Sequence, residues 1–359
     1  MNILKLFKTF VMTAALAAAT SLSLTSCDGV IYDDEGDCSV TYRLKFRYDM
    51  NLKWADAFAN EVKSVHLYAF DQSGTLVWEG TESGSVLAAD GYTMTLPLPA
   101  GNYKLVAWCG LDNEGSAEKS FTVPEATVGK TKLADITCRL NTRSNETYDA
   151  YSDKRLDFLF HGQLDVMLPE NLDGGDYTYV MPLVKDTNHI RIILQQLSAE
   201  HLDVNQFNFR IEDANGLMGS DNLLIGEDPV HYLEWNKQSG TAGVGKPDIL
   251  SASRGIIQVN GAIADFTVGR MMADHKKKMI LTITNHRGEL VAQVPVIQYA
   301  LLAKDYYEEA YGHKMDEQEF LDREDEYVLT FFLDQNLQWI STSILIHSWR
   351  IVLHDYDLD

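Results

Sequence analysis

The fold class follows from the stretch Val62-Lys-Ser-Val-His-Leu-Tyr-Ala-Phe70, which leads into Asp71-Gln-Ser-Gly74 and then into Thr75-Leu-Val-Trp-Glu79. Asp, Ser and Gly are typical turn residues, and strand-forming runs on both sides of a short turn are typical of a β-hairpin. Upstream, Val40–Tyr48 alternates apolar and polar residues, as a half-buried strand does. This part of the chain therefore predicts paired β-strands.

Short strand patterns separated by Gly, Pro and Asp recur over the rest of the chain. They predict a mainly β protein made of β-sandwiches with a few short helices. A short crossover helix is expected within 52–60, a helix at Lys304–Tyr311, and another after Asp316, which precedes Glu319 in a capping-box arrangement. The segment Asn236–Lys246 is rich in glycine and is expected to be a mobile loop. Further strands are expected at Tyr92–Leu98, Asn102–Cys109, Tyr177–Leu183, His189–Gln195, Phe207–Glu212, Ile256–Val259, Met279–Asn285, Val291–Val296, Tyr327–Leu333 and Trp349–Leu353.

The N-terminus has the pattern of an exported lipoprotein. Lys5 and Lys8 precede an apolar, Ala-rich stretch, and Leu24-Thr-Ser-Cys27 closes it with a small residue before a cysteine. This tetrapeptide resembles a bacterial lipobox, in which cleavage leaves Cys27 as the first residue, carrying diacylglycerol on its sulfur and an acyl chain on its nitrogen. One acyl chain anchors a protein only marginally, whereas three hold it stably in a membrane. We therefore predict a signal peptide over 1–26 and lipidation of Cys27.

An acidic tether and two domains are expected to follow. Residues 27–37 contain five acidic side chains and two glycines, which predicts a flexible segment. An acidic run after a lipidated cysteine also resembles the sorting signal that places lipoproteins of Bacteroidetes-type bacteria on the outer face of the outer membrane. With 359 residues in the chain, two domains are the default expectation. The polar break at 141–149 divides them into 38–147 and 148–359.

The charge of the chain excludes several kinds of partner. Residues 1–26 hold two lysines and no acid, so the remaining 28 basic and 52 acidic residues give a net charge of −24. Nucleic acid and anionic lipid headgroups require clustered Lys and Arg, whereas the longest basic run in this chain, Lys276–Lys278, has only three residues and is more typical of a solvated turn or edge strand. We therefore expect no nucleic-acid partner.

Three cysteines remain once Cys27 is lipidated: Cys38, Cys109 and Cys138. An odd number leaves at least one thiol unpaired in an oxidising compartment. We predict a disulfide between Cys38 and Cys109, because one precedes the first strand and the other ends a strand. Cys138 is then a small buried apolar residue. The sequence alone does not settle this connectivity.

The sequence contains no complete motif for catalysis, metal binding or cofactor binding. Gly240–Pro247 matches a phosphate-binding loop except that Pro247 stands where Ser or Thr must hold magnesium. The ten histidines show no zinc-ligand spacing, and no nucleophile elbow is present. Tyr306, Tyr307 and Tyr311 could stack on sugar rings, but at this spacing on one helix they are more typical of packing residues. We expect no enzyme activity, no metal and no cofactor.

Several segments together resemble the FimB/Mfa2 family of Bacteroidetes fimbrial proteins, which are the lipid-anchored base subunits of type V pili. The segments that carry the resemblance are Cys27-Asp28, Asp33–Cys38, Lys45–Asp49, Ala55–Phe58, Val65–Asp71, Pro99–Tyr103, Leu105–Leu111, Glu319–Tyr327, Phe331–Asp334 and Trp349–Leu353.

The resemblance implies two tandem transthyretin-like β-sandwich domains and a non-enzymatic role in cell adhesion. It implies a subunit that attaches a fimbria to the outer membrane and limits its length, with pilin subunits as partners through strand exchange. Host or bacterial surface ligands are further candidate partners. A surface glycan-binding β-sandwich lipoprotein is the alternative, and it would require an exposed aromatic platform on a sheet face or loop cluster.

Overall fold

The computed structural model describes residues 40–112, 118–170, 174–196, 202–245, 256–346 and 349–352. The expected signal peptide, the lipidated Cys27, the acidic tether and Cys38 lie outside the described residues. Within the described residues the protein is mainly β, with several sheets and a few short helices, as the sequence predicts.

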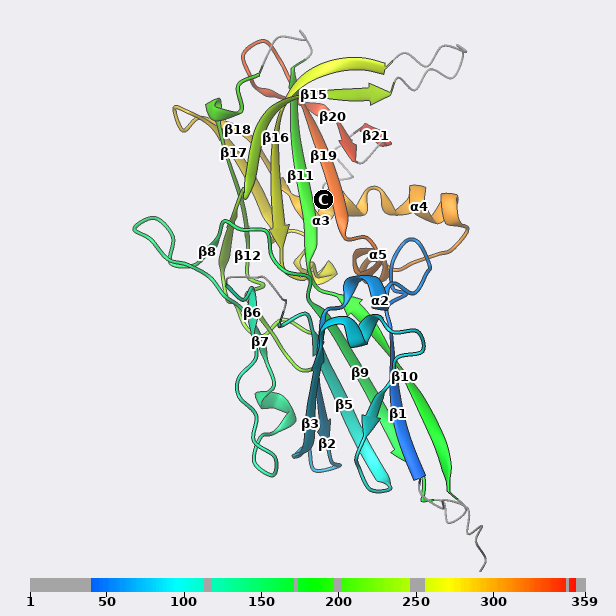
Figure 1. Ribbon diagram of the computed structural model, residues 1–359. Coiled ribbons are helices and arrows are strands. Elements are labelled where there is room, and N and C mark those ends of the chain that lie inside the picture. Colours follow the sequence, from blue (N-terminus) through cyan, green and yellow to red (C-terminus); the bar gives the residue numbers. More distant parts are fainter. Residues whose placement is uncertain are drawn as a thin grey trace, which may run out of the picture. The chain divides into compact units, whose positions relative to one another are not determined.

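The first sheet has seven strands in the order β3-β2-β5-β9-β10-β1-β4 (Figure 1). The hairpin expected from the sequence supplies β2 and β3 and is confirmed. At its turn, Asp71 accepts hydrogen bonds from the N–H groups of Ser73 and Thr75, and Gly74 has a φ of 70°, which favours glycine. The strands are β1 Val40–Arg47, β2 Ser64–Phe70, β3 Leu76–Ser83, β4 Met94–Leu96, β5 Gly101–Cys109, β9 Phe160–Leu168 and β10 Gly175–Lys185.

The first sheet continues across the expected domain boundary between 147 and 148. Strand β5 pairs with β9 in antiparallel register from Gly101↔Leu168 to Cys109↔Phe160. Both β9 and β10 follow the boundary, yet they lie between β5 and β1, which precede it. The polar break at 141–149 is therefore a connection from which the chain returns to complete the first sheet, and it does not separate two sets of strands.

Two larger sheets and one small sheet contain the remaining described strands. The six-stranded sheet consists of β15 Asn236–Gly245, β16 Ile256–Val268, β11 Asn188–Gln196, β19 Glu326–Leu333, β20 Trp339–Ile346 and β21 Trp349–Val352. The five-stranded sheet consists of β18 Leu290–Pro295, β17 Ile280–Asn285, β12 Phe207–Asp213, β14 Val230–Leu233 and β8 Tyr151–Ser152. The small sheet consists of β13 Leu217–Met218, β7 Cys138–Leu140 and β6 Phe121–Thr122.

A single buried cluster of apolar side chains connects these sheets. Leu194 and Phe331 of the six-stranded sheet, Ile211 of the five-stranded sheet and Trp108 of the first sheet all belong to it and are fully buried. Such residues alternate with exposed ones along most strands, because neighbouring side chains of a strand point to opposite faces.

The segment expected to be a mobile loop at Asn236–Lys246 is instead strand β15. It pairs with β16 from Asn236↔Asp265 to Gly245↔Ile256. Main-chain hydrogen bonds hold this pairing and do not require apolar side chains. The glycine content that suggested a loop was therefore misleading.

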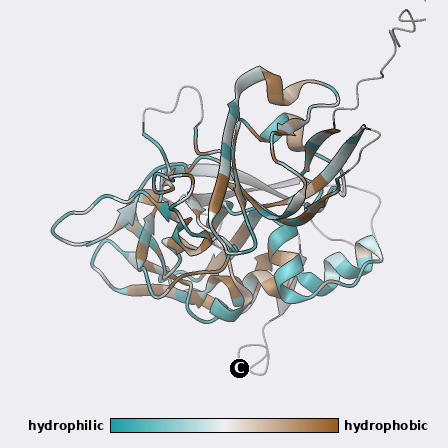
Figure 2. Ribbon diagram, turned by 90° about the horizontal axis from the view of Figure 1, so that it is seen from below, coloured by the Kyte–Doolittle hydropathy of each residue, from teal (hydrophilic) through white to brown (hydrophobic). Residues whose placement is uncertain are grey.

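Four short α-helices lie among the described residues: α2 Phe58–Glu61, α3 Val296–Leu301, α4 Lys304–Tyr311 and α5 Glu317–Arg323. The expected helices at Lys304–Tyr311 and after Asp316 are confirmed, and the Asp316 carboxylate accepts a hydrogen bond from the Glu319 N–H. Of the expected 52–60 segment only 58–60 is helical, and α2 ends one residue later, at Glu61. Helix α4 has no buried residue, and its hydrophilic character is visible in Figure 2.

Candidate functional site

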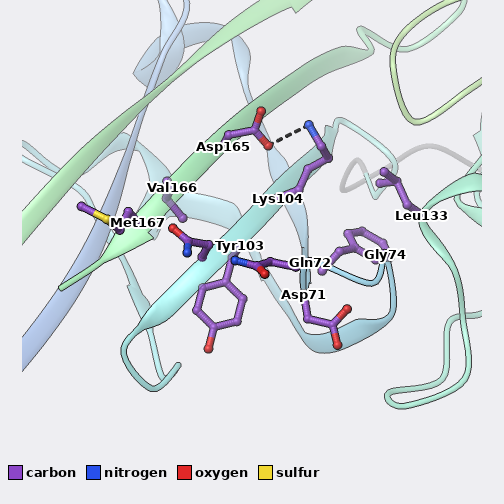
Figure 3. Close-up of a pocket in the computed structure, with 11 residues that line it drawn as sticks. Asp71, Gln72, Gly74, Tyr103, Lys104, Leu133, Asp165, Val166 and Met167 are labelled. Atoms are coloured by element: carbon purple, nitrogen blue, oxygen red, sulfur yellow. Dashed lines mark ion pairs between the residues drawn. The ribbon is translucent and has the colours of Figure 1, made fainter. Parts of the chain in front are cut away.

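A pocket of about 420 Å³ lies where the β2–β3 turn meets the start of β5 and the end of β9 (Figure 3). We call it the tip pocket. It is formed by the predicted turn at 71–74, by the start of β5 just after the predicted turn at 99–101, and by β9, which follows the expected domain boundary. Its lining residues are Phe70, Asp71, Gln72, Gly74, Asn102, Tyr103, Lys104, Leu133, Asp165, Val166 and Met167.

Alternation along β5 divides the polar groups of the tip pocket between two sides of the sheet. Figure 3 shows Lys104 and Asp165 reaching toward each other on one side, while the Tyr103 ring points to the other. The Lys104 Nζ lies 2.7 Å from an Asp165 carboxylate oxygen. Because Asp165 is largely exposed, this ion pair contributes at most about 1 kcal/mol.

Two titratable side chains of the tip pocket form hydrogen bonds within their own turns. The Ser73 hydroxyl and the N–H groups of Thr75 and Ser73 hold the pKa of Asp71 below its ordinary value. Tyr103 donates a hydrogen bond to the Pro99 carbonyl at 3.1 Å, and burial raises its pKa. Asp71 and Tyr103 therefore stabilise the loops that shape the pocket.

The tip pocket is suited to binding. The amides of Gln72 and Asn102 line it beside apolar Met167 and Leu133, and Met167 is 67% exposed. Catalysis by a nucleophile would need a Ser, Cys or Lys activated by a nearby base; no Ser or Cys lines the tip pocket, and Lys104 is held in the ion pair with Asp165. Small polar ligands with an apolar face, such as a sugar ring, match this combination of groups.

Sequence reasoning did not identify the tip pocket. The turns at 71–74 and 99–101 are legible in the sequence, but Asp165–Met167 reach the pocket only because β9 pairs with β5. This pairing joins residues more than fifty positions apart, and no local pattern encodes it.

The three tyrosines of α4 divide between packing and exposure. The Tyr307 ring lies 5.5 Å from the Phe320 ring and stacks on Tyr311 at 6.0 Å. Tyr306 and Tyr311 are 37% and 50% exposed. One tyrosine thus packs against α5, and two present their rings to solvent.

Cys109 and Cys138 are fully buried, and neither forms a disulfide with another described residue. Burial raises the pKa of both, so neither is reactive near neutral pH. Tyr48, which directly follows β1, packs its ring on Phe160. Phe160 pairs with Cys109 in the first sheet, so Cys109 lies near this end of β1. Tyr42 lies near the other end. A disulfide between Cys38 and Cys109 would require the chain before Tyr42 to turn back along the sheet, and this pairing stays a prediction.

The most strongly buried charges lie away from the tip pocket. Asp186 is fully buried and accepts hydrogen bonds from Arg270 at 2.7 Å and from Asn222 at 3.0 Å. Arg270 also donates to Asp322 at 3.2 Å. Burial raises the pKa of both carboxyl groups against the opposing effect of Arg270. Altered pKa values often mark functional sites, but these charges already pair with one another out of contact with solvent, so we interpret the cluster as structural.

Two kinds of feature are absent from the described residues, metal-binding clusters and membrane-spanning helices. In those ranges no group of three His, Cys, Asp or Glu side chains is arranged to hold a metal ion. No helix there has the length and apolar character to cross a membrane.

A family model described as fimbrillin-A associated anchor proteins Mfa1 and Mfa2 matches residues 34–355. The minor fimbrium anchoring subunit Mfa2 of Porphyromonas gingivalis is 22% identical over 213 residues. This alignment covers 58% of the chain, and the chain spans only 61% of the length of that curated relative.

Solved structures share the fold over most of the chain. A candidate adhesin from Bacteroides thetaiotaomicron is 31% identical, with a TM-score of 0.74 over 89% of this chain and 100% of that one. A candidate polysaccharide-binding protein from the same species is 26% identical, with a TM-score of 0.71 and the same coverage. The fimbrial anchor protein Mfa2 of P. gingivalis is 16% identical, with a TM-score of 0.62 over 88% of this chain and 100% of that one, and this likeness concerns the fold alone.

Proposed function

The chain belongs to the family of fimbrillin-A associated anchor proteins Mfa1 and Mfa2, and we propose that it is the lipid-anchored base subunit of a fimbria. One observation carries the proposal: the family match begins at residue 34, only seven positions after the cysteine of the Leu24-Thr-Ser-Cys27 lipobox. An anchor needs both a membrane attachment and a folded body that holds the fimbria, and these two parts of the chain supply them.

In this proposal lipidated Cys27 lies in the outer membrane, and the acidic tether directs the folded body to the cell surface. The body comprises two tandem transthyretin-like sandwiches that hold pilin subunits through strand exchange and limit the length of the fimbria. Head-to-tail contacts between different surfaces suit such a fibre, because they do not close into a ring. The role requires no catalysis and no cofactor.

The test is replacement of the lipidated residue. Cys27→Ala should abolish incorporation of radiolabelled palmitate and release fimbriae into the medium. Ser23→Ala, which lies in the signal peptide but outside the lipobox, should leave both unchanged. The anchor proposal would be lost if Cys27→Ala cells retained their fimbriae and no pilin co-purified with the tagged protein.

The tip pocket favours glycan binding as a second candidate function. Its amides and apolar surface match a sugar ring, and one related structure is described as a candidate polysaccharide-binding protein. Calorimetry with ligands selected on a glycan array should show binding that Asn102→Ala and Gln72→Ala weaken. Gln293→Ala, on the distant strand β18, is the control. Equal affinities of all three variants would exclude the tip pocket as the binding site.

A further inference from the structure

Edge strands expose a row of unpaired main-chain N–H and C=O groups to which another strand can add. Proteins usually protect such edges with charged side chains, proline, bulges or very short strands. An edge that lacks all of these devices is a candidate site for strand addition.

Most edges in the described part of the chain carry at least one of these devices. In the first sheet, β3 bears Glu79 and Glu82, and β4 is three residues long. In the five-stranded sheet, β18 has a bulge near its start in its pairing with β17 and ends at Pro295, and β8 has two residues. Both edges of the small sheet are two-residue strands, and β21 has four residues, including Arg350.

Strand β15 is the exception among the described edges. It forms one edge of the six-stranded sheet (Figure 1) and is ten residues long, which corresponds to roughly 33 Å. From Gln238 to Gly245 the sequence contains no charged residue and no proline. The register with β16 runs without a shift over all ten residues, so no bulge turns this edge away from a partner.

Apart from its pairing with β16, the described side-chain hydrogen bonds of β15 lie at its beginning. The Val204 N–H donates to the Ser239 hydroxyl at 2.9 Å, and the Lys237 ammonium donates to the Phe207 carbonyl at 2.6 Å. Lys237, the only charged residue of β15, is thereby held against β12 and does not protect the edge. Among the described strands, β16 pairs with 240–245 on one side, and no second strand pairs on the other.

We propose that the outer edge of β15 receives an extended strand of a fimbrial shaft subunit, which joins the six-stranded sheet through main-chain hydrogen bonds. The inference rests on the proposed anchor function, which supplies the partner, and it goes further by naming the edge. Glycines at 240, 243 and 245 leave the side chains of the incoming strand room, so recognition is mainly through the backbone. No strand of this chain has to leave for the addition to occur.

The test uses full-length lipoprotein extracted in detergent and fimbriae shed by a strain that lacks this gene. Thr241→Lys and Ala242→Lys each place a charge on the proposed edge and should weaken capture of these fimbriae roughly tenfold or more. Ser83→Lys makes the same change on β3, an edge already carrying acidic residues, and should capture them like the wild type. Hydrogen exchange should show slower exchange of the β15 amides in the complex.

The outcomes separate the two proposals. If the wild type captures fimbriae, both edge variants do so equally well and the β15 amides are not protected, strand addition at β15 is wrong and the anchor function stands. If the wild type captures no fimbriae, both proposals are wrong. Self-association of the wild type that the two edge variants abolish would assign β15 to a second copy of this chain and overturn the shaft-subunit partner.

Discussion

At the scale of single residues, Asp186 shows how the fold accommodates charge in its interior. The carboxylate lies between β10 and β11 with no exposed surface, and it is held by Arg270 and Asn222. A buried ion pair often adds little net stability, but removing one partner leaves a charge that neither water nor protein compensates. Arg270 also contacts Asp322 of α5, so one guanidinium connects two elements far apart in sequence.

Arg270→Met should therefore lower the free energy of unfolding by about 3–5 kcal/mol, because Asp186 loses its cation inside the protein. Urea denaturation at pH 7 measures the change. Arg47→Met is the matched control: the Arg47–Asp49 pair is exposed, and its loss should cost no more than about 1 kcal/mol. Similar costs for the two variants would contradict the interpretation of the Asp186 cluster.

A second residue-scale prediction concerns pH. Burial raises the pKa of Glu324 to about 7, from an ordinary value of 4.5. Between these values the folded protein keeps a proton that the unfolded chain has lost, so this group lowers stability as pH rises through the window, by about 3 kcal/mol in total. Burial also lowers the pKa of His161 to about 4, and His161 has the opposite effect between about pH 4 and 6.5.

Comparison with Glu324→Gln isolates the first effect. The stability of the wild type minus that of the variant should fall as pH rises from 4.5 to 7 and then level off. Glu326→Gln, at an exposed neighbouring position, should give a difference that does not depend on pH in this way. A flat difference for Glu324→Gln would mean that its carboxyl titrates normally.

At the scale of elements, α5 is held in place from its N-terminus and from its side. Asp316 caps the helix at 2.7 Å from the Glu319 N–H, Phe320 is fully buried, and the Arg323 guanidinium lies 3.8 Å from the centre of the Trp54 ring. The cap was readable from the sequence because it depends on residues three positions apart. The contact with Trp54 was not, since it joins residues 269 positions apart.

Asp316→Ala should destabilise the protein by about 1 kcal/mol, because the first turn of α5 loses the acceptor for one of its unpaired N–H groups. Thermal unfolding followed by circular dichroism measures this loss. Asp305→Ala in the first turn of α4 removes an acidic residue that is not a cap and should have a smaller effect. A larger loss of stability in Asp305→Ala than in Asp316→Ala would show that α5 does not depend on its cap.

At the scale of the whole molecule, the first sheet is completed by strands from beyond the expected boundary. Removing β9 and β10 would separate β5 from β1 in the middle of the sheet. A fragment of residues 38–147 should therefore lack cooperative thermal unfolding and give poorly dispersed amide NMR signals, whereas the full-length protein unfolds cooperatively. A well-dispersed spectrum from the fragment would show that the first half folds without β9 and β10.

The sequence by itself determined those features that depend on near neighbours. The β2–β3 hairpin, helix α4 and the Asp316 cap were predicted correctly, because alternation, turn residues and capping act over a few positions. The prediction that Leu24–Cys27 is a lipobox likewise rests on adjacent residues alone.

Only the tertiary structure decided which strands pair beyond that hairpin. The sequence suggested a loop where β15 lies and a boundary where the chain returns to the first sheet, and it gave no sign of the tip pocket. For the first sheet and the tip pocket the outcome depends on main-chain hydrogen bonds to a strand distant along the chain, and β15 is held by such bonds to the next strand, β16. Such bonds are available to almost any residue, so a local pattern cannot specify their partner.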